Sequence, residues 1–332
     1  MTKKITIEDI ASRCGVSKAT VSYVLNGKKT PMKISGNTVR EILTTCRELG
    51  YRPDKTAQAL AYLRKTPLDL IILTPWLYSQ YSDFMAQINA AFEGISREKA
   101  IKFSYAYYRR GSLSDLLTSN KFDRYDAVVI AGTSSADDRY LAENKDSLAN
   151  VILLNRYVDG VCSVYGNDRE VTSQLAQSVK DKNYYDSFVN IREASDSLCR
   201  IERNTALDTV FGTSRYTKVS FNGTMDAATA LELYNTYKKG KTCFAFTTFS
   251  PASLFLIHLI RAGVKVPEEC GIICFDIHTL ISDYLPLQLT TVDPRLSEMV
   301  HAAYETALAI KRGERGESVM VRGDVIPGET VI

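Results

Sequence analysis

Residues 6–26, TIEDIASRCGVSKATVSYVLN, determine the fold of the N-terminal part of this chain. Apolar residues in both halves of the stretch recur at the i, i+3, i+4 spacing of one helical face. They are Ile7, Ile10 and Ala11, followed by Val21, Val24 and Leu25. Gly15 permits a tight turn between the halves, and Ser17 is a suitable N-cap for the second helix. The pattern predicts either a helix-turn-helix, whose second helix reads the DNA major groove, or a helical hairpin with a solvated face.

A third helix is expected over Asn37–Leu49, which completes a small all-α domain. Ser35 is its expected N-cap and Gly50 its C′ residue. We expect its inward side to carry the apolar residues Val39, Ile42, Leu43 and Cys46.

The charge of the chain is divided between its two parts. Residues 1–66 contain 13 Lys and Arg against 5 Asp and Glu, a formal charge of +8, whereas the remainder carries −5. This distribution is expected if only the N-terminal part contacts DNA phosphates. Seven cysteines without C-x-x-C pairing, and a start without an apolar signal stretch, favour a cytoplasmic protein. No run of residues approaches the length of a membrane span.

From Leu68 onward, apolar runs alternate with helical patterns. The runs, typical of parallel strands buried on both faces, are LDLIILTP at 68–75, YDAVVIAG at 125–132, NVILLNR at 150–156 and CGIICFD at 270–276. Further strands are expected at 103–108, 184–191 and 242–247. Such alternation predicts an α/β fold with doubly wound parallel sheets, here in two lobes.

The chain resembles the LacI/GalR family of bacterial transcriptional repressors. The resemblance is carried by T-I-E-D-I-A, G-V-S-x-A-T-V-S-x-V-L-N, L-G-Y-R-P and A-x-x-L-A in the first 62 residues. It is also carried by YLPLQLTTVDP at 284–294, which is similar to the family's P-x-L-T-T-V stretch. It implies a DNA-binding headpiece at residues 1–51, a hinge helix and linker at 52–66, and a two-lobed periplasmic-binding-protein-like domain at 67–332. It further implies a homodimer on a palindromic operator, controlled by a small, sugar-like molecule in the interlobe cleft. The alternative is a regulator of the same fold controlled by a protein partner or by no ligand.

The resemblance also implies which residues bind DNA. Lys18, Ala19 and Tyr23 match the base-reading positions of the second helix, and Leu60 matches a hinge residue that wedges into the minor groove. The remaining expected contacts are Thr6, Ser17, Thr20, Ser22, Asn26, Ser35, Thr38, Lys55 and Ala57. The family most often has arginine where Tyr23 stands, so this chain lacks the usual guanine-reading fork.

Ligands of open α/β sheets bind beyond the carboxyl ends of the strands. Strand ends and family positions together nominate Trp76, Tyr81, Asn155, Arg156, Arg203, Thr248, Phe249 and Asp276 as effector-binding residues. In the family, the residue that Arg203 matches forks onto sugar hydroxyls, the one that Asp276 matches accepts hydroxyl hydrogen bonds, and the one that Tyr81 matches stacks on a sugar ring.

Three dipeptides depart from the family pattern in this part of the chain. Thr248-Phe249 replaces the usual N-D, Gly166-Asn167 replaces D-N, and Thr205-Ala206 replaces A-G. The first change removes a carboxylate and adds an apolar ring. An oligosaccharide, a phosphosugar, a less polar metabolite or no ligand at all remain open as the effector.

The sequence does not predict an enzyme. The three histidines, His258, His278 and His301, form no metal pair, and there is no nucleophile elbow, phosphate-binding loop or dinucleotide fingerprint. We therefore expect no catalytic residue, metal or cofactor. A secreted solute-binding protein would share the large fold, but the basic headpiece argues against it.

Overall fold

The computed structural model describes residues 5–25, 34–49, 51, 67–76, 82–118, 122–212, 215–276 and 281–332. By its contacts the chain divides into two compact units, Met1–Thr66 and Pro67–Ile332. Several predicted site residues lie outside the described ranges, namely Asn26, Lys55, Ala57, Leu60 and Tyr81, as does His278.

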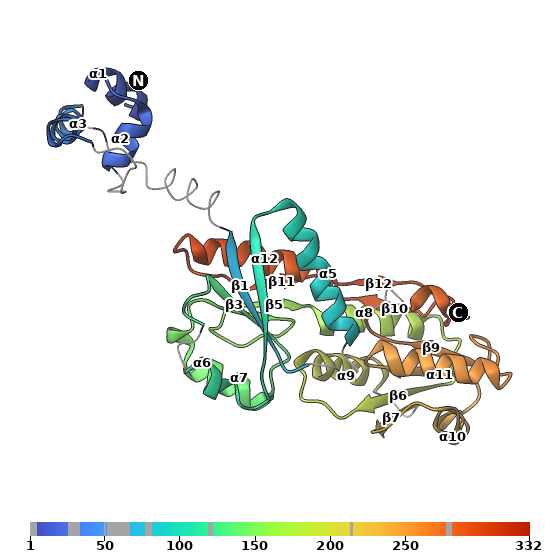
Figure 1. Cartoon of the computed structure of the whole chain (residues 1–332). Coiled ribbons are helices and arrows are strands. Elements are labelled where there is room, and N and C mark those ends of the chain that lie inside the picture. The colour runs from blue at the N-terminus through green and yellow to red at the C-terminus, as the bar shows by residue number, and fades with distance from the viewer. Residues whose placement is uncertain are drawn as a thin grey trace. The chain divides into compact units, whose positions relative to one another are not determined.

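The first unit contains three described helices around one small core (Figure 1). They are α1 (Ile7–Cys14), α2 (Lys18–Leu25) and α3 (Gly36–Glu48). Their shared core consists of Ile10, Ala11, Val21, Ile42 and Cys46. This core joins residues from all three helices, so α2 is held in place by its neighbours and not by its own short length.

Side-chain caps fix where each of these helices begins. Thr6 and Asp9 form a capping box, in which the Thr6 hydroxyl accepts from the Asp9 N–H at 3.3 Å and the Asp9 carboxylate accepts from the Thr6 N–H at 2.8 Å. The predicted caps Ser17 and Ser35 are confirmed, since each hydroxyl accepts from the N–H three residues ahead at 3.1 Å. Gly15 ends α1 with a φ of 63°, a left-handed conformation that suits glycine.

The prediction that Leu43 points inward is wrong. Its side chain is 40% exposed, whereas that of Ile42 is fully buried. Ile42 and Cys46 are four residues apart and share the face that α3 turns toward the core. Leu43 lies about 100° further round the helix from Ile42, beyond the edge of that face.

The first lobe of the second unit is built on a six-stranded parallel sheet in the order β11-β5-β4-β3-β1-β2. Its strands are β1 (Leu68–Thr74), β2 (Ile101–Tyr107), β3 (Ala127–Ala131), β4 (Val151–Leu154), β5 (Ser163–Gly166) and β11 (Val319–Val321). One face packs against α5 (Ser82–Glu98) and α12 (Leu296–Lys311), the other against α6 (Leu113–Leu117) and α7 (Ser135–Glu143). β1 is covered on both faces, so all residues of its continuous apolar run are buried. Leu70 and Ile72 pack into one core, and Ile71 and Leu73 pack into the other.

The second lobe has a four-stranded parallel sheet in the order β7-β6-β8-β9. The strands are β6 (Ser187–Glu193), β7 (Tyr216–Phe221), β8 (Thr242–Phe246) and β9 (Cys270–Ile273). Residues of α10 (Ala227–Tyr237) and α11 (Phe249–Arg261) cover one face, and those of α8 (Asp168–Asp181) and α9 (Leu198–Phe211) the other. An antiparallel pair, β10 (Thr291–Asp293) and β12 (Asp324–Ile326), and the 3-10 turns Lys145–Ser147 and Ser282–Tyr284 complete the described elements.

The predicted fold class is confirmed: helix-turn-helix helices precede an α/β unit with two parallel sheets. The strands expected at 68–75, 125–132, 150–156 and 270–276 correspond to β1, β3, β4 and β9. β5, β7, β10, β11 and β12 were not predicted. None of the helices in the described ranges is long and apolar enough to cross a membrane.

Replacing Ile42 by alanine is expected to remove about 2–5 kcal/mol from the stability of the three-helix unit, because Ile42 is fully buried in its only described core. Hydrogen exchange measured by mass spectrometry should then show lost protection in α1, α2 and α3, with β1 and β3 unchanged. Leu43→Ala, at the exposed neighbouring position, is the control and should leave protection intact. Equal loss in both variants would contradict this core assignment.

Candidate nucleic-acid interface and interlobe cavity

One face of α2 is exposed and plays no part in the core of its unit. Lys18 and Ala19 are exposed at its start, and Tyr23 is 37% exposed one turn later, whereas Val21 is fully buried. The three predicted base-reading residues therefore lie on the side of the helix that faces away from the core. A helix held in this way can enter a major groove with these side chains leading.

Lys18 has a partner that the sequence analysis did not identify. Its Nζ lies 2.6 Å from Oε1 of Glu8 on α1. Both side chains are more than 60% exposed, at 61% and 66%, so the pair contributes little to stability. Lys18 can therefore exchange Glu8 for a phosphate or a base edge at small cost.

The expected phosphate contacts lie at helix N-termini. Thr6, Ser17 and Ser35 are exposed and each is the cap at the start of a helix. Helix N-termini attract phosphate through their free N–H groups and the positive end of the helix dipole. The described part of the first unit thus offers three such termini besides its lysines and arginines.

A cavity of about 350 Å³ lies between the two lobes of the second unit. Seven of the eight effector-binding residues nominated from the sequence line it: Trp76, Asn155, Arg156, Arg203, Thr248, Phe249 and Asp276. All of them except Arg203, which lies on α9, follow the carboxyl ends of strands in the two lobes. Tyr81 lies outside the described residues.

Arg203 on α9 is the most completely engaged side chain of the cavity. It is 2% exposed, and its Nη1 and Nη2 donate to both carboxylate oxygens of Asp276 at 3.1 and 2.8 Å. Its Nε donates to Asp168 at 2.7 Å, and Nη1 also donates to the Thr247 carbonyl at 2.9 Å. Burial by itself would lower the pKa of Arg203, but the charges of Asp276 and Asp168 raise it well above its ordinary value. The Arg203 guanidinium, which the family resemblance assigns to sugar hydroxyls, is thus paired with the Asp276 carboxylate. The resemblance assigns that carboxylate as an acceptor for hydroxyl groups as well.

Asn155 and Asp276 share an uncommon backbone conformation. Their φ angles are 56° and 74°, in the left-handed region that few residues other than glycine adopt. Asn155 follows β4 in the first lobe and Asp276 lies three residues after β9 in the second. Both line the cavity, which places backbone strain at the candidate site in each lobe.

Glu193 supplies a carboxylate beside the position where the family pattern loses one. It is the last residue of β6, and its Oε2 accepts a hydrogen bond from the Thr248 hydroxyl at 2.7 Å. The same oxygen lies 3.5 Å from Nη1 of Arg200 on α9. Glu193 therefore contacts a side chain from the first turn of α9 and the side chain of the N-cap residue of α11, whereas residues 248 and 249 carry no carboxylate.

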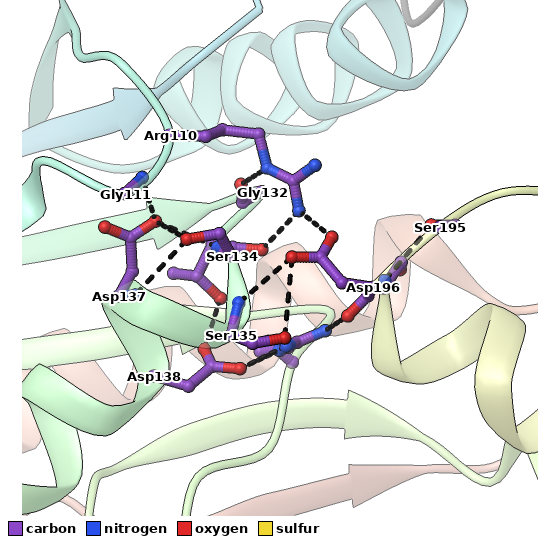
Figure 2. A network of polar contacts seen from close by, with 12 residues as sticks. Arg110, Gly111, Gly132, Ser134, Ser135, Asp137, Asp138, Ser195 and Asp196 are labelled. Atoms are coloured by element: carbon purple, nitrogen blue, oxygen red, sulfur yellow. Dashed lines mark hydrogen bonds and ion pairs between the residues drawn. The ribbon is translucent and has the colours of Figure 1, made fainter.

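Asp196, in the segment between β6 and α9, crosses from the second lobe to the first (Figure 2). Its Oδ1 accepts from Arg110 at 2.6 Å, and its Oδ2 accepts from the Ser135 N–H at 3.1 Å. Its backbone carbonyl accepts from Nη1 of Arg156 at 3.1 Å. Burial would raise the pKa of Asp196, but the hydrogen bonds from Ser135 and Arg110, with the charge of Arg110, hold it below its ordinary value.

The donors that meet Asp196 are held in place within the first lobe. Arg110 also donates to the carbonyls of Gly132 and Thr133, at 3.1 and 2.8 Å (Figure 2). Arg156 donates from Nε to Asp138 at 2.9 Å. Nearby, Asp137 accepts from the Ser134 hydroxyl at 2.7 Å and caps the start of α7. The first lobe therefore presents a preorganised anion-binding receptacle into which Asp196 fits.

Aromatic and aliphatic side chains form the apolar part of the cavity. Trp76 and Phe84 of the first lobe pack edge to face, with ring centroids 5.2 Å apart. The second lobe contributes Phe221, Met225 and Phe249. Together with the carboxylates, these rings form a lining that suits a molecule with both an apolar face and hydroxyl groups.

Four residues at or beside the cavity were not predicted from the sequence, namely Arg110, Glu193, Asp196 and Arg200. The rule that strand ends line the cavity could have identified Glu193, but the predicted strand stopped at residue 191 and β6 continues to Glu193. Asp196 and Arg110 lie outside the strands, and no spacing in the sequence relates them. Among the described residues, no group of three or more His, Cys, Asp and Glu side chains could hold a metal ion.

Two family models match the sequence. The model described as bacterial regulatory proteins, lacI family, matches residues 6–54, and the periplasmic binding protein-like domain matches residues 212–331. The first match covers the helices α1, α2 and α3. The second covers most of the second lobe, including α11 and the segment that holds Asp276.

Relatives with similar sequences are transcriptional regulators. The probable HTH-type transcriptional repressor ExuR of Bacillus subtilis is 26% identical over 177 residues, which are 52% of this chain and 50% of ExuR. The HTH-type transcriptional regulator GalS of Salmonella typhimurium is 26% identical over 318 residues, covering 92% of this chain and 89% of GalS. The sucrose operon repressor of Klebsiella pneumoniae is 39% identical over 143 residues, 42% of this chain and 41% of that repressor. The matches to ExuR and the sucrose operon repressor thus span half of those proteins or less.

Solved structures share the whole architecture. The lac repressor dimer bound to operator and the anti-inducer ONPF superposes with a TM-score of 0.62 at 17% identity, covering 99% of both chains. The transcriptional regulator CelR in complex with cellobiose gives a TM-score of 0.62 at 18% identity, covering 98% of this chain and 99% of CelR. At these identities the likeness shows a common fold.

A helix-turn-helix unit followed by a two-lobed unit with an interlobe cavity defines a class of protein, the DNA-binding transcriptional regulators that carry an effector-binding domain. The relatives in this class are regulators and repressors, not enzymes. The match of residues 6–54 to the lacI family model and of residues 212–331 to the periplasmic binding protein-like domain agrees with the resemblance seen in the sequence.

Replacing Arg203 by methionine is expected to lower the free energy of unfolding of the second unit by about 3–5 kcal/mol, because it leaves the carboxylates of Asp168 and Asp276 without their buried partner. Urea unfolding followed by the fluorescence of Trp76, the single tryptophan, measures this loss. Arg169→Met removes an exposed partner of Glu202 and should cost less than about 1 kcal/mol. A loss no larger for Arg203→Met than for this control would show that the buried pairs do not stabilise the lobe.

Proposed function

We propose that this regulator is a cytoplasmic repressor that binds a palindromic operator as a homodimer and responds to a small, sugar-like effector in the interlobe cavity. The observation that carries the DNA-binding part is the exposed face of α2, with Lys18, Ala19 and Tyr23, on a headpiece matched by the lacI family model. The effector part is supported by the cavity, which seven of the residues nominated from the sequence line.

Two arguments support a homodimer. One headpiece reads only a short half-site, and a two-fold axis pairs two half-sites into a palindrome. The second unit also exposes large apolar side chains at Tyr107, Leu254 and Tyr284, of which Tyr284 is 86% exposed. Burial of such groups against a second copy would stabilise association. The lac repressor of similar fold is described as a dimer bound to operator.

The lining of the cavity supports a hydroxylated effector. The carboxylates of Asp276 and Glu193 offer acceptors for hydroxyl groups, and the rings of Trp76 and Phe249 offer apolar faces. Proteins similar to this chain include a CelR–cellobiose complex and a sucrose operon repressor. The same combination of chemistry would recognise a carbohydrate here.

Operator binding is expected to depend strongly on salt. The basic residues in or beside the headpiece are Lys3, Lys4, Lys18, Lys28, Lys29, Lys33 and Arg40. If roughly six to ten phosphates are neutralised per dimer, affinity should fall on the order of 10³–10⁵-fold between about 50 and 200 mM salt. Fluorescence anisotropy with operator DNA measures the slope. Lys18→Gln should reduce the slope and Lys182→Gln, an exposed lysine of the second unit, should not. A slope near zero would mean that the headpiece is not the contact surface.

Tyr23→Arg is expected to shift operator preference toward guanine at one symmetric pair of positions. Arginine supplies a bidentate fork for O6 and N7 that tyrosine lacks, which is worth about 1–3 kcal/mol per contact. Selection from randomised DNA with the wild type and the variant measures the change. Leu60→Ala is the control, because loss of the proposed wedge should weaken all sites without changing the selected sequence.

The same selection tests the symmetry of the operator. A palindromic consensus is the expected result for both wild type and Tyr23→Arg. Single, unpaired half-sites would overturn the proposed dimeric binding. An unchanged sequence for Tyr23→Arg would show that Tyr23 does not read bases.

A further inference from the structure

We infer that the interlobe cavity selects an uncharged, hydroxylated effector and rejects anionic sugars such as sugar phosphates and hexuronates. This inference rests on the proposed effector control and narrows it. Four arginines line the cavity, which at first sight suggests an anionic ligand: Arg110, Arg156, Arg200 and Arg203. Each of them is already paired with a carboxylate of the chain.

Four of the five N–H donors of Arg203 already bind groups of the chain. Its Nε and both Nη atoms are used by Asp168, Asp276 and the Thr247 carbonyl at 2.7–3.1 Å. The bidentate geometry on Asp276 is the arrangement that a guanidinium would otherwise make with a phosphate or an external carboxylate. A ligand anion would have to displace Asp276 and leave its charge beside the ligand.

The helix N-termini at the cavity also face a built-in negative charge. α9 and α11 begin at Leu198 and Phe249, and neither has a side-chain cap. Uncapped N-termini attract anions, but the carboxylate of Glu193 already contacts the first turn of α9 through Arg200 and the N-cap of α11 through Thr248. An anion approaching either turn would therefore come close to the charge of Glu193, whereas a neutral hydroxyl group would meet no such repulsion.

Asp196 occupies the remaining anion receptacle. This receptacle combines the guanidinium of Arg110 with the Ser135 N–H at the start of α7, and the second lobe fills it with the Asp196 carboxylate (Figure 2). Arg156 beside it pairs with Asp138. In the absence of Asp196, the same donors would form a site for a phosphate or carboxylate group.

The four lining arginines and the carboxylates that pair with them sum to a negative charge, and of these carboxylates Glu193 and Asp276 line the cavity itself. Four arginines face five carboxylates, those of Asp138, Asp168, Glu193, Asp196 and Asp276. An anion entering the cavity meets Glu193 and Asp276 in its wall, and like charges placed together disfavour binding. A neutral carbohydrate instead donates its hydroxyls to these same carboxylates and lays its apolar face on the rings.

The test compares wild type with Asp196→Ser, which empties the receptacle. Isothermal titration calorimetry uses inorganic phosphate, glucose 6-phosphate and glucuronate as anionic probes, and sucrose and cellobiose as neutral ones. Wild type should bind none of the anions at millimolar concentration. Asp196→Ser should bind inorganic phosphate on the order of 10- to 100-fold more tightly than wild type, because the Arg110 guanidinium and the Ser135 N–H lose their carboxylate partner.

Two further variants keep the result interpretable. Asp196→Asn preserves the size of the side chain and removes only its charge, so it should gain phosphate affinity even if Asp196→Ser is poorly folded. Asp123→Asn removes an exposed carboxylate that does not line the cavity and should behave as wild type.

The outcomes separate this inference from the proposed effector control. Binding of glucose 6-phosphate or glucuronate to wild type as tightly as to Asp196→Ser overturns it, and so does the absence of any phosphate gain in both Asp196 variants. A phosphate gain in these variants, with neutral sugars that neither bind wild type nor alter its operator affinity, supports the charge selection and counts against control by a sugar.

Discussion

The buried guanidinium of Arg203 constrains how the segments of the second unit pack around it. A charge this deeply buried is tolerated only when it is paired and its donors are satisfied. Asp168 at the start of α8, the Thr247 carbonyl after β8 and Asp276 after β9 together meet that requirement. These three segments are distant in sequence. The Arg203 side chain on α9 therefore fixes how α9 packs against the start of α8 and against the ends of β8 and β9.

The cavity lining follows from that arrangement. Because Arg203 holds both carboxylate oxygens of Asp276, the aspartate is aimed at the cavity in one orientation while 39% of its side chain stays exposed. The left-handed φ of Asp276 is maintained by the same contacts, since an unfavourable backbone conformation persists only where its surroundings determine it. Arg203 thus acts on a ligand mainly by positioning the groups that bind it.

The sequence predicted those parts of the molecule that depend on local patterns. Helix periodicity and the caps Ser17 and Ser35 located the headpiece, and continuous apolar runs located β1, β3, β4 and β9. The strand-end rule nominated Asn155 and other cavity residues for the same reason. Asp196 could not be found this way, because its role depends on two loops meeting across the cleft. The three-residue strands β10, β11 and β12 could not be predicted either, because so short a segment shows no recognisable alternation of apolar and polar residues.

The Asp196 contact also limits how an effector can act. Asp196 of the second lobe joins the first lobe by accepting hydrogen bonds from Arg110 and Ser135. Lobe closure therefore does not require a charged group on the ligand to connect the two lobes. The Arg110 and Asp196 side chains are 40% and 39% exposed, and an ion pair of that exposure is worth about 1 kcal/mol or less. This ion pair alone therefore does not lock the lobes together, and the hydrogen bonds from Ser135 and Arg156 to Asp196 add to it. An effector changes the balance between open and closed arrangements of the lobes only by the difference in its affinity for the two. Hydroxyl contacts to Asn155 in one lobe and Asp276 in the other would supply such a difference, because they can be made together only when the lobes are closed.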